Sequence, residues 1–408
     1  MLKLYNHQKE LIDKNPKKYL LAHGCGSGKT ITSIKLVEKK NEIALIICPK
    51  SIRHQWEEEL DKHAIDSNKW CVITKEEFRR DWNKISKYNA ICIDEFHFFL
   101  GMTGYRKKSA MLKSLLSYIK KHNPEIIYGL TATPFLSSPY NLYAAWEILG
   151  LVPTELKRKY EFHRKFKEHF FSMVNMGGRF PVPIMKKNIE KDIARMVNKI
   201  GNTVSLQDCF DVPEQTFITE YFDLTGEQKK AINNLEEEGI ARWTKTHQIC
   251  GGSLKGDGYT ENKYFNCEKT KRVSELAKEH DKLIIVCRYN NEINYLKTLL
   301  KGVECLVVNG SVKDRHSIIN KANTSKKCIV LIQAGCSEGY ELPTFPIMVF
   351  YSYDFSLKNY IQIKGRILRA NKLKKNLYIS LVVRNSIDND VYKCIKAKKK
   401  FDIAIYNK

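Results

Sequence analysis

The sequence predicts an α/β protein built from two parallel sheets, each flanked by helices. Two series of short apolar runs alternate with amphipathic segments, which is typical of successive β-α-β units. The first series is KYLLAH, EIALIICP, WCVIT, NAICIDE and EIIYGLT, and the second is KLIIVCR, ECLVVNG, CIVLIQAG, IMVFYS and LYISLVV. Between them lies a helix-like stretch rich in Lys, Arg and Phe. We therefore expect a first domain at 1–153, a basic helical connector at 154–220 and a second domain at 221–408.

Composition indicates a globular protein with an anionic partner. The chain has 408 residues, 43% of them hydrophobic, and a net charge of +24. This excess of basic residues favours a polyanion as partner, although abundant Lys is also typical of an AT-rich genome. No apolar run approaches the roughly 18 residues of a membrane span, and the N-terminus is too polar for a signal peptide. The twelve scattered cysteines form no C-x-x-C pair, so we expect reduced thiols in a cytoplasmic protein without structural zinc.

The strongest chemical signal is the turn HGCGSGKT, which lies between a predicted strand and a predicted helix. A glycine-rich turn at this place lets backbone N–H groups and a helix N-terminus surround phosphates. We expect Lys29 to neutralise the β- and γ-phosphates of ATP, and the Thr30 hydroxyl to ligate Mg²⁺. The strict pattern has another residue where His23 stands, and the alternative is a coincidental glycine-rich turn. The predicted nucleotide-binding residues of the turn are Gly24, Cys25, Gly26, Ser27, Gly28, Lys29 and Thr30.

A second signal is the pair of carboxylates in ICIDEFHFF, at the end of another predicted strand. Two adjacent carboxylates at a strand end can have separate roles, one in binding a metal ion and the other in activating water. Asp94 is expected to hold Mg²⁺, and Glu95 is expected to orient and deprotonate the attacking water. His97 completes this candidate set. The alternative, a pair of solvated charges, is disfavoured by the four apolar residues that precede them.

A third signal lies in the second predicted domain, in YIQIKGRILRANK. Arg366 and Arg369 are three residues apart and share one helix face, with Gln362 one turn earlier. Surface charge is the default interpretation of such a pair. Phosphoryl transfer, however, uses cationic side chains that reach the γ-phosphate. If they come from a separate domain, hydrolysis depends on domain closure.

Taken in order, these motifs resemble those of a superfamily 2 helicase over nearly the whole chain. LYNHQKELI is similar to the adenine-reading motif, with Gln8 in the key place. HGCGSGKT, IDEFH and LTATP resemble motifs I, II and III, and LIIVCRYNNEINYL resembles motif IV. QAGCSEGYELP and QIKGRILR resemble motifs V and VI. The resemblance implies two RecA-like domains that bind ATP with Mg²⁺.

Within that superfamily, several stretches resemble the Swi/Snf-like branch. They are CPKSIRHQWEEEL, LTATPFLSSPYNLYAAWEILGLVP and SLQDCFDVPEQTFITEYFDLTGEQKKAI. The branch usually has T-G-T where Thr131-Ala132-Thr133 stands here, and its double-arginine signature is missing. Without large insertions in the second domain, the chain looks like a compact phage- or virus-encoded member.

The resemblance also implies roles for residues outside the three signals. Gly339 and Glu341 are expected to bind the nucleotide from the second domain. Trp56 is expected in the core of the first domain rather than against a base. The residues expected to contact a nucleic-acid backbone are Lys50, Ser51, Arg53, Thr131 and Thr133. For Lys50 and Arg53, an ordinary solvated helix start is the alternative.

The connector has two interpretations. Residues 157–199 contain twelve Lys or Arg and four acidic residues, so the segment can contact DNA. Phe162, Phe166 and Phe170 recur every four residues, which predicts the buried stripe of a helix. We expect burial for the Phe residues and DNA contact for part of the charge.

The sequence as a whole predicts a DNA-stimulated ATPase that tracks along double-stranded DNA. One alternative is a strand-separating DNA or RNA helicase of viral replication, recombination or transcription, although no sequence signature identifies a wedge. Another is a nucleic-acid-sensing switch that hydrolyses ATP without travelling. A small-molecule kinase with a phosphate-binding turn predicts a single domain and no distant Q-x-x-G-R-x-x-R, so the second series of strands disfavours it.

Overall fold

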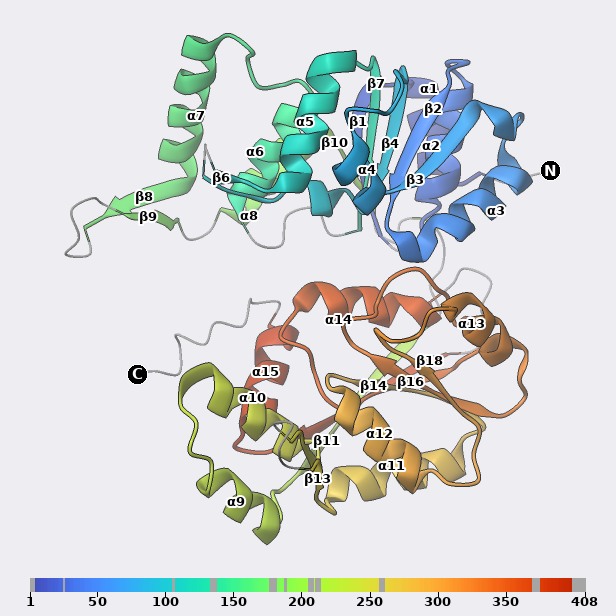
Figure 1. Cartoon of the computed structure of the whole chain (residues 1–408), viewed down its shortest axis with the longest axis vertical. Coiled ribbons are helices and arrows are strands. Elements are labelled where there is room, and N and C mark those ends of the chain that lie inside the picture. The colour runs from blue at the N-terminus through green and yellow to red at the C-terminus, as the bar shows by residue number, and fades with distance from the viewer. Residues whose placement is uncertain are drawn as a thin grey trace. The chain divides into compact units, whose positions relative to one another are not determined.

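The computed structural model shows two compact units, Met1–Phe210 and Asp211–Lys408 (Figure 1). The structure describes residues 4–24, 26–104, 107–132, 138–175, 182–186, 189–204, 209, 214–256, 261–368 and 375–397. This division differs from the expected one, because most of the segment expected as a connector folds within the first unit. No helix among the described residues is long and apolar enough to span a membrane.

The first unit is built on a six-stranded parallel sheet with the strand order β10-β1-β7-β4-β2-β3. Its strands are β1 (Lys18–His23), β2 (Ala44–Cys48), β3 (Trp70–Thr74), β4 (Ala90–Asp94), β7 (Ile126–Leu130) and β10 (Gly201–Val204). Every residue of β2 is fully buried, as expected for a parallel sheet that is covered on both faces. Alternate side chains of the strands enter two separate apolar clusters, one on each face.

Helices cover both faces of this sheet. They are α1 (Asn6–Lys14), α2 (Lys29–Glu38), α3 (Arg53–His63), α4 (Lys75–Asp81), α5 (Ala110–His122) and α6 (Pro139–Ile148). Side chains of α1, α2 and α3 share one apolar cluster, and those of α4, α5 and α6 share the other. Short 3-10 turns lie at Lys50–Ile52, Ser67–Lys69 and Phe96–Phe99, and a small antiparallel pair joins β5 (Met102–Gly104) to β6 (Lys107–Lys108).

The remainder of the first unit is what we call the basic segment. It consists of α7 (Leu156–Phe170), the antiparallel strands β8 (Phe171–Val174) and β9 (Val182–Met185), and α8 (Glu190–Val197) (Figure 1). Phe166 and Phe170 are buried, and the Phe166 ring lies 5.2 Å from that of Tyr143 on α6. The predicted burial is therefore confirmed for Phe166 and Phe170, and Phe162 is partly buried against the same cluster. The segment leads into β10, which pairs with β1.

The second unit has its own six-stranded parallel sheet, with the order β11-β18-β17-β14-β16-β15. Its strands are β11 (Gln215–Phe222), β14 (Lys282–Cys287), β15 (Cys305–Val308), β16 (Cys328–Gln333), β17 (Ile347–Phe350) and β18 (Asn376–Val383). Its helices are α9 (Gly226–Asn233), α10 (Gly239–Cys250), α11 (Glu268–Glu279), α12 (Asn290–Leu299), α13 (Arg315–Thr324), α14 (Leu357–Lys364) and α15 (Ile387–Lys396). A short pair, β12 (Ser253–Leu254) and β13 (Lys263–Tyr264), lies outside the sheet. The predicted fold class, two α/β domains with parallel sheets, is confirmed.

Candidate nucleotide-binding and catalytic site

The glycine-rich turn joins β1 directly to α2. Gly26 and Gly28 have φ angles of +81° and +82°, in the left-handed region that glycine adopts at little cost. A Cβ on Gly28 would lie 2.5 Å from the Gln8 Nε2 atom, so close packing also requires glycine there. Because α2 begins at Lys29, its unpaired N–H groups lie at the turn, as phosphate binding requires.

Lys29 and Ser27 bind the backbone of this turn. The Lys29 Nζ atom donates to the carbonyl oxygens of His23 at 2.8 Å and Gly24 at 3.0 Å. The Ser27 hydroxyl donates to the Gly24 oxygen at 2.7 Å. The structure thus places the ammonium group against the same turn whose N–H groups can hold an anion. Cys25 lies outside the described residues.

Gln8 connects α1 to the turn. Its side chain is buried, accepts from the Tyr5 N–H at 2.8 Å and donates to the Gly28 oxygen at 3.1 Å and the Thr32 hydroxyl at 3.0 Å. The two Nε2 contacts therefore hold α1 against the start of α2, while the Oε1 contact caps the N-terminus of α1 itself. The adenine-reading role of Gln8 stays a prediction, and the structure adds that the residue is rigidly held beside the turn.

The two carboxylates lie at the end of β4, at the same edge of the sheet as the turn. Strands β1, β7 and β4 are consecutive neighbours and all parallel, so their carboxyl ends meet at one edge. The Asp94 carboxylate is half-buried beside Glu95 and accepts from the Glu95 N–H at 2.8 Å. Burial, followed by the charge of Glu95, raises the pKa of Asp94 to about 6. Glu95 itself has a φ of +48°, an uncommon backbone conformation for a non-glycine residue.

His97 connects Glu95 to the end of β7. The Glu95 Oε2 atom lies 3.1 Å from the His97 Nδ1 atom, and the same nitrogen lies 3.3 Å from the Thr131 hydroxyl. The Thr131 N–H donates to the Leu21 oxygen at 3.1 Å. A continuous set of contacts therefore runs from the candidate general base to Thr131. Thr133 lies outside the described residues.

Trp56 is a site residue that the sequence did not reveal. It is buried in the core, as expected, but its indole Nε1–H also donates to the Asp94 Oδ2 atom at 2.8 Å. This bond favours the ionised carboxylate and opposes the effect of burial on the pKa of Asp94. The one signal in the sequence is general: a buried indole N–H requires an acceptor.

Asn202 of β10 is a second site residue that the sequence did not reveal. Its Oδ1 atom lies 2.8 Å from the His23 Nε2 atom, and the Val204 oxygen accepts from the Gly24 N–H at 2.8 Å. The first residues of the phosphate-binding turn are thus held by the strand that follows the basic segment. Pairing between strands so distant in sequence leaves no local pattern that could predict it.

Lys50, Ser51 and Arg53 follow β2, whose carboxyl end lies at the same sheet edge. Lys50 and Ser51 are exposed. Arg53 is partly exposed and forms ion pairs with Glu57 at 3.1 Å and Glu77 at 3.4 Å. The structure therefore shows a polar helix start in which two of the three side chains are accessible.

The candidate residues of the second unit meet at the loop after β16. The Arg366 guanidinium donates from Nε to the Ser337 oxygen at 2.7 Å and from Nη1 to the Tyr340 oxygen at 3.0 Å. The Ser337 hydroxyl donates to the Gln362 Oε1 atom at 2.8 Å, and both Gln362 and Arg366 are buried. Within this loop, Gly339 has a φ of +80°.

Glu341, at the end of that loop, has an exposed side chain, and its backbone oxygen accepts from Asn323 at 3.0 Å. Arg369 lies outside the described residues. In the structure, Gln362 and Arg366 therefore anchor the loop that carries Gly339 and Glu341. This anchoring role was not predicted.

Comparison with known proteins places these elements in recognised domains. Residues 8–100 match the SNF2-related domain, and residues 268–371 match the helicase conserved C-terminal domain. The first unit therefore carries a region similar to the SNF2-related domain, and the second unit carries a region similar to the helicase conserved C-terminal domain.

Individual relatives are distant. An uncharacterized ATP-dependent helicase of Mycoplasma pneumoniae is 22% identical, over 95% of this chain and 41% of its own length. A protein of Acanthamoeba polyphaga mimivirus, described provisionally as an ATP-dependent RNA helicase, is 29% identical over 33% of this chain and 29% of its own length. The chain thus spans less than half the length of these relatives. The SWI2/SNF2 ATPase core of Sulfolobus solfataricus, solved in complex with dsDNA, is 20% identical with a TM-score of 0.41, over 97% of this chain and 91% of that chain.

A pH-dependent stability is expected from His23. Burial lowers the pKa of His23 to about 4, from an ordinary value of 6.5. Between these values the unfolded chain binds more protons than the folded one, so stability falls as the pH falls from about 6.5 to about 4. Asp94 acts in the opposite direction: its pKa is raised from an ordinary value of 3.8 to about 6, so its contribution lowers the stability of the fold as the pH rises from about 3.8 to about 6. We expect His23→Gln to lose less stability than the wild type between pH 7 and pH 5.

The test is the denaturant midpoint of both proteins at pH 7, 6 and 5. Asp94 is present in both, so its contribution cancels in the difference between them. Equal pH dependence of the two midpoints would show that His23 is not the group that takes up a proton when the chain unfolds.

Proposed function

We propose that the chain is a DNA-stimulated ATPase that moves along double-stranded DNA. The observation that carries the proposal is the set of contacts Glu95–His97–Thr131, with distances of 3.1 Å and 3.3 Å. It links the candidate base for ATP hydrolysis to a residue proposed to contact nucleic acid. A shift of Thr131 when nucleic acid binds would reposition Glu95 through His97, and this supplies a physical route for stimulation.

In this proposal ATP lies at the turn, with its phosphates held by α2 and Lys29. The donor set fits Mg²⁺, a hard cation that prefers oxygen ligands: Thr30 supplies a hydroxyl and Asp94 a carboxylate. The raised pKa of Asp94 supports this, since a half-buried carboxylate beside the charge of Glu95 gains from a nearby cation. Bound Mg²⁺ would neutralise phosphate charge. Glu95 orients the attacking water and accepts its proton, and Gln8 contacts the adenine.

Trp56 is expected to set the Mg²⁺ requirement. Trp56→Phe keeps an aromatic side chain in the core but removes the N–H donor of Asp94. Loss of such a supporting hydrogen bond costs about 10–100-fold in metal affinity. The Mg²⁺ concentration that gives half-maximal ATPase activity is therefore expected to rise by about that factor. Titration of Mg²⁺ at saturating ATP measures it.

Trp70→Phe is the matched control, because Trp70 packs against the same apolar cluster from the amino end of β3, level with Ala90 rather than with Asp94. It should leave the Mg²⁺ requirement unchanged. A Trp56→Phe enzyme with the Mg²⁺ requirement of the wild type would remove Trp56 from the site.

The second unit contributes to turnover in the same proposal. Arg366 and Arg369 supply positive charge to the γ-phosphate, and Gln362 holds the loop that presents Gly339 and Glu341 to the nucleotide. The contacts of Arg366 to the Ser337 and Tyr340 oxygens support a coupling between this loop and the arginine. A change in the bound nucleotide would thereby alter the positions of α14 and of the loop together.

The nucleic-acid path in the first unit consists of Lys50, Ser51, Arg53, Thr131 and Thr133. Contacts of this kind to phosphates supply affinity without sequence information, as a protein that travels along DNA needs. The net charge of +24 supports a polyanionic partner. We further propose that the chain works in the cytoplasm and that it comes from a virus or phage, for which the mimivirus relative gives partial support.

Duplex tracking is tested by displacement of a third strand from triplex DNA, in parallel with unwinding of a forked duplex. ATP-dependent displacement of the third strand without unwinding supports tracking. Unwinding of the fork favours the strand-separating helicase. Hydrolysis stimulated by DNA with neither activity favours a sensing switch. The fork is tested as DNA and as RNA, because one relative is described as an RNA helicase.

A further inference from the structure

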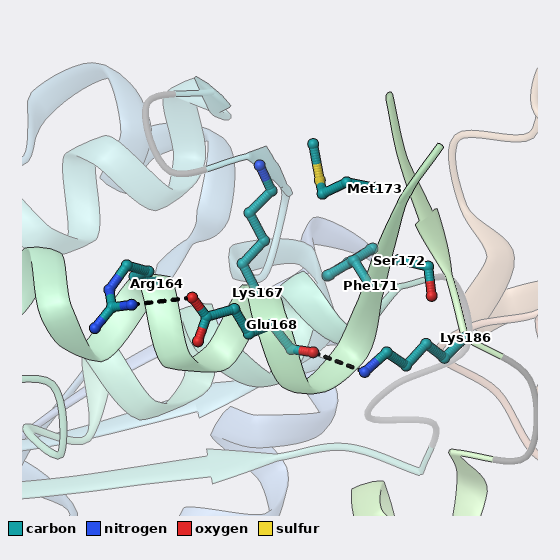
Figure 2. Close-up of a pocket in the computed structure, with 7 residues that line it drawn as sticks. All are labelled: Arg164, Lys167, Glu168, Phe171, Ser172, Met173 and Lys186. Atoms are coloured by element: carbon teal, nitrogen blue, oxygen red, sulfur yellow. Dashed lines mark hydrogen bonds and ion pairs between the residues drawn. The ribbon is translucent and has the colours of Figure 1, made fainter. Parts of the chain in front are cut away.

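A groove on the basic segment lies outside the site described above. It is formed where the last turns of α7 meet strand β8, and it has a volume of about 470 Å³ (Figure 2). It is lined chiefly by Arg164, Lys167 and Glu168 of α7, Phe171 and Met173 of β8, and Lys186 after β9. None of these residues takes part in the proposed ATP chemistry.

The groove carries three cationic groups and one carboxylate. The Glu168 carboxylate is bound by Arg164 at 3.1 Å, and the Glu168 backbone oxygen accepts from the Lys186 Nζ atom at 2.7 Å (Figure 2). Lys167 extends between the Arg164–Glu168 pair and Met173 (Figure 2) and forms no ion pair with any described residue. The groove therefore has an excess of positive charge.

The Arg164–Glu168 pair can exchange Glu168 for another anion at little cost. Its side chains are 55% and 61% exposed, and ion pairs this exposed contribute little to stability. A guanidinium binds phosphate with two parallel N–H groups, which strengthens and orients the contact. A phosphate group in the groove would thus gain Arg164 and Lys167 as partners without breaking a buried contact.

The groove is held on a rigid base. The inner face of α7 is fixed by the buried rings of Phe166 and Phe170, and Phe171 stacks on Tyr140 at 4.9 Å. Cations on such a fixed face lose less entropy on binding than cations on a free loop. Met173, 46% exposed, adds an apolar surface beside the charges that a sugar can cover.

The surrounding charge favours a polyanion over a small anion. Residues 157–199 hold twelve Lys or Arg against four Asp or Glu, a net charge of +8 out of +24 for the whole chain. Repeated contacts between such a surface and phosphates supply sequence-independent affinity through counterion release.

We propose that this groove binds the phosphate backbone of duplex DNA through Arg164, Lys167 and Lys186, as a contact in addition to the path at Lys50–Arg53 and Thr131. The inference rests on the proposed function for its choice of partner. The groove is a binding site only, so it contributes to affinity for DNA and not to the hydrolysis of ATP.

The test is a triple variant, Arg164→Gln, Lys167→Gln and Lys186→Gln, compared with the full chain and a charge-matched control. The control is Lys113→Gln, Lys120→Gln and Lys121→Gln, three exposed lysines of α5 outside the groove. Duplex DNA affinity is measured over a range of salt concentrations, together with ATPase activity without DNA and at saturating DNA. Thermal melting verifies that each variant is folded.

We expect the groove variant to bind duplex DNA more weakly, with a salt dependence less steep by about 0.9 in log Kd per log salt for each phosphate that the variant no longer neutralises. Its ATPase rates without DNA and at saturating DNA should equal those of the wild type, and the α5 control should retain the full slope. Wild-type affinity and slope in the groove variant, or an equal loss in the control, would overturn the proposal. If the groove variant loses affinity but wild-type hydrolysis is indifferent to DNA, the groove stands and the proposed motor function fails.

Discussion

Glu95→Gln is expected to lower ATP turnover about 10²–10⁴-fold, the usual contribution of a general base. Glutamine keeps the shape of the side chain but cannot accept the proton of the attacking water. ATP should still bind, because Lys29 and the N-terminus of α2 are unchanged. The measurements are the steady-state ATPase rate and the affinity for a fluorescent ATP analogue.

Glu76→Gln is the matched control, since Glu76 is a largely exposed glutamate of α4 in the same unit. It should keep the wild-type rate. A Glu95→Gln enzyme with wild-type turnover would show that another group activates the water. Loss of nucleotide binding instead of turnover would make Glu95 a binding residue.

Arg366→Ala is expected to lower turnover by about 10³–10⁵-fold, the range seen for arginines that stabilise the transition state of phosphoryl transfer. The structure adds a second effect. The variant leaves the Ser337 and Tyr340 oxygens without their guanidinium partner, and each unpaired buried group costs about 1–3 kcal/mol. The second unit should therefore also unfold at lower temperature. ATPase assays and thermal melting of the same sample measure the two effects.

Arg366→Lys separates the two roles, because it keeps the charge but cannot reproduce the fixed geometry of the guanidinium. We expect partial turnover from it. Arg384→Ala, which removes a half-exposed arginine paired with Asp223 in the same unit, is the control and should change neither property. Reduced stability with wild-type turnover in Arg366→Ala would make this residue an anchor of the loop only.

Most of the fold could be predicted from local pattern. Each apolar run of the two series forms a parallel strand, because burial on both faces selects uninterrupted β-branched and apolar residues. Strand β10 was not predicted. Its four residues, GNTV, lack that pattern, and what holds them is pairing with β1. A Cβ on Gly201 would lie 2.0 Å from the Leu20 oxygen, so the close approach of the two strands explains the glycine.

The boundary between the units differs from the prediction because it, too, depends on strand pairing rather than on local pattern. The expected connector at 154–220 includes β10 of the first sheet and most of β11 of the second. β11 lies at the edge of its sheet and exposes Phe217 and Tyr221. Its residues QTFITEYF are typical of a strand, but they do not show which sheet the strand joins. Only the pairing of distant strands, which composition cannot encode, assigns these residues to the two units.

For the site, the sequence located the residues whose chemistry depends on spacing along the chain. Lys29, Asp94 and Glu95 lie at one edge of the first sheet, as the order of motifs required. What the sequence could not reveal are partners from elsewhere in the fold. The hydrogen-bond partners of Asp94 and His23 are Trp56 and Asn202, which belong to separate elements of the fold. Each of these two side chains has an ordinary structural interpretation when considered alone.

The central claim is that nucleic acid, and duplex DNA in particular, controls ATP hydrolysis by this chain. It is tested most directly by the ATPase rate of the full chain measured in parallel without nucleic acid and with duplex DNA, single-stranded DNA and RNA. We predict a severalfold rise with duplex DNA and a smaller rise with the other two. A rate that is the same under all four conditions would contradict the proposed motor function.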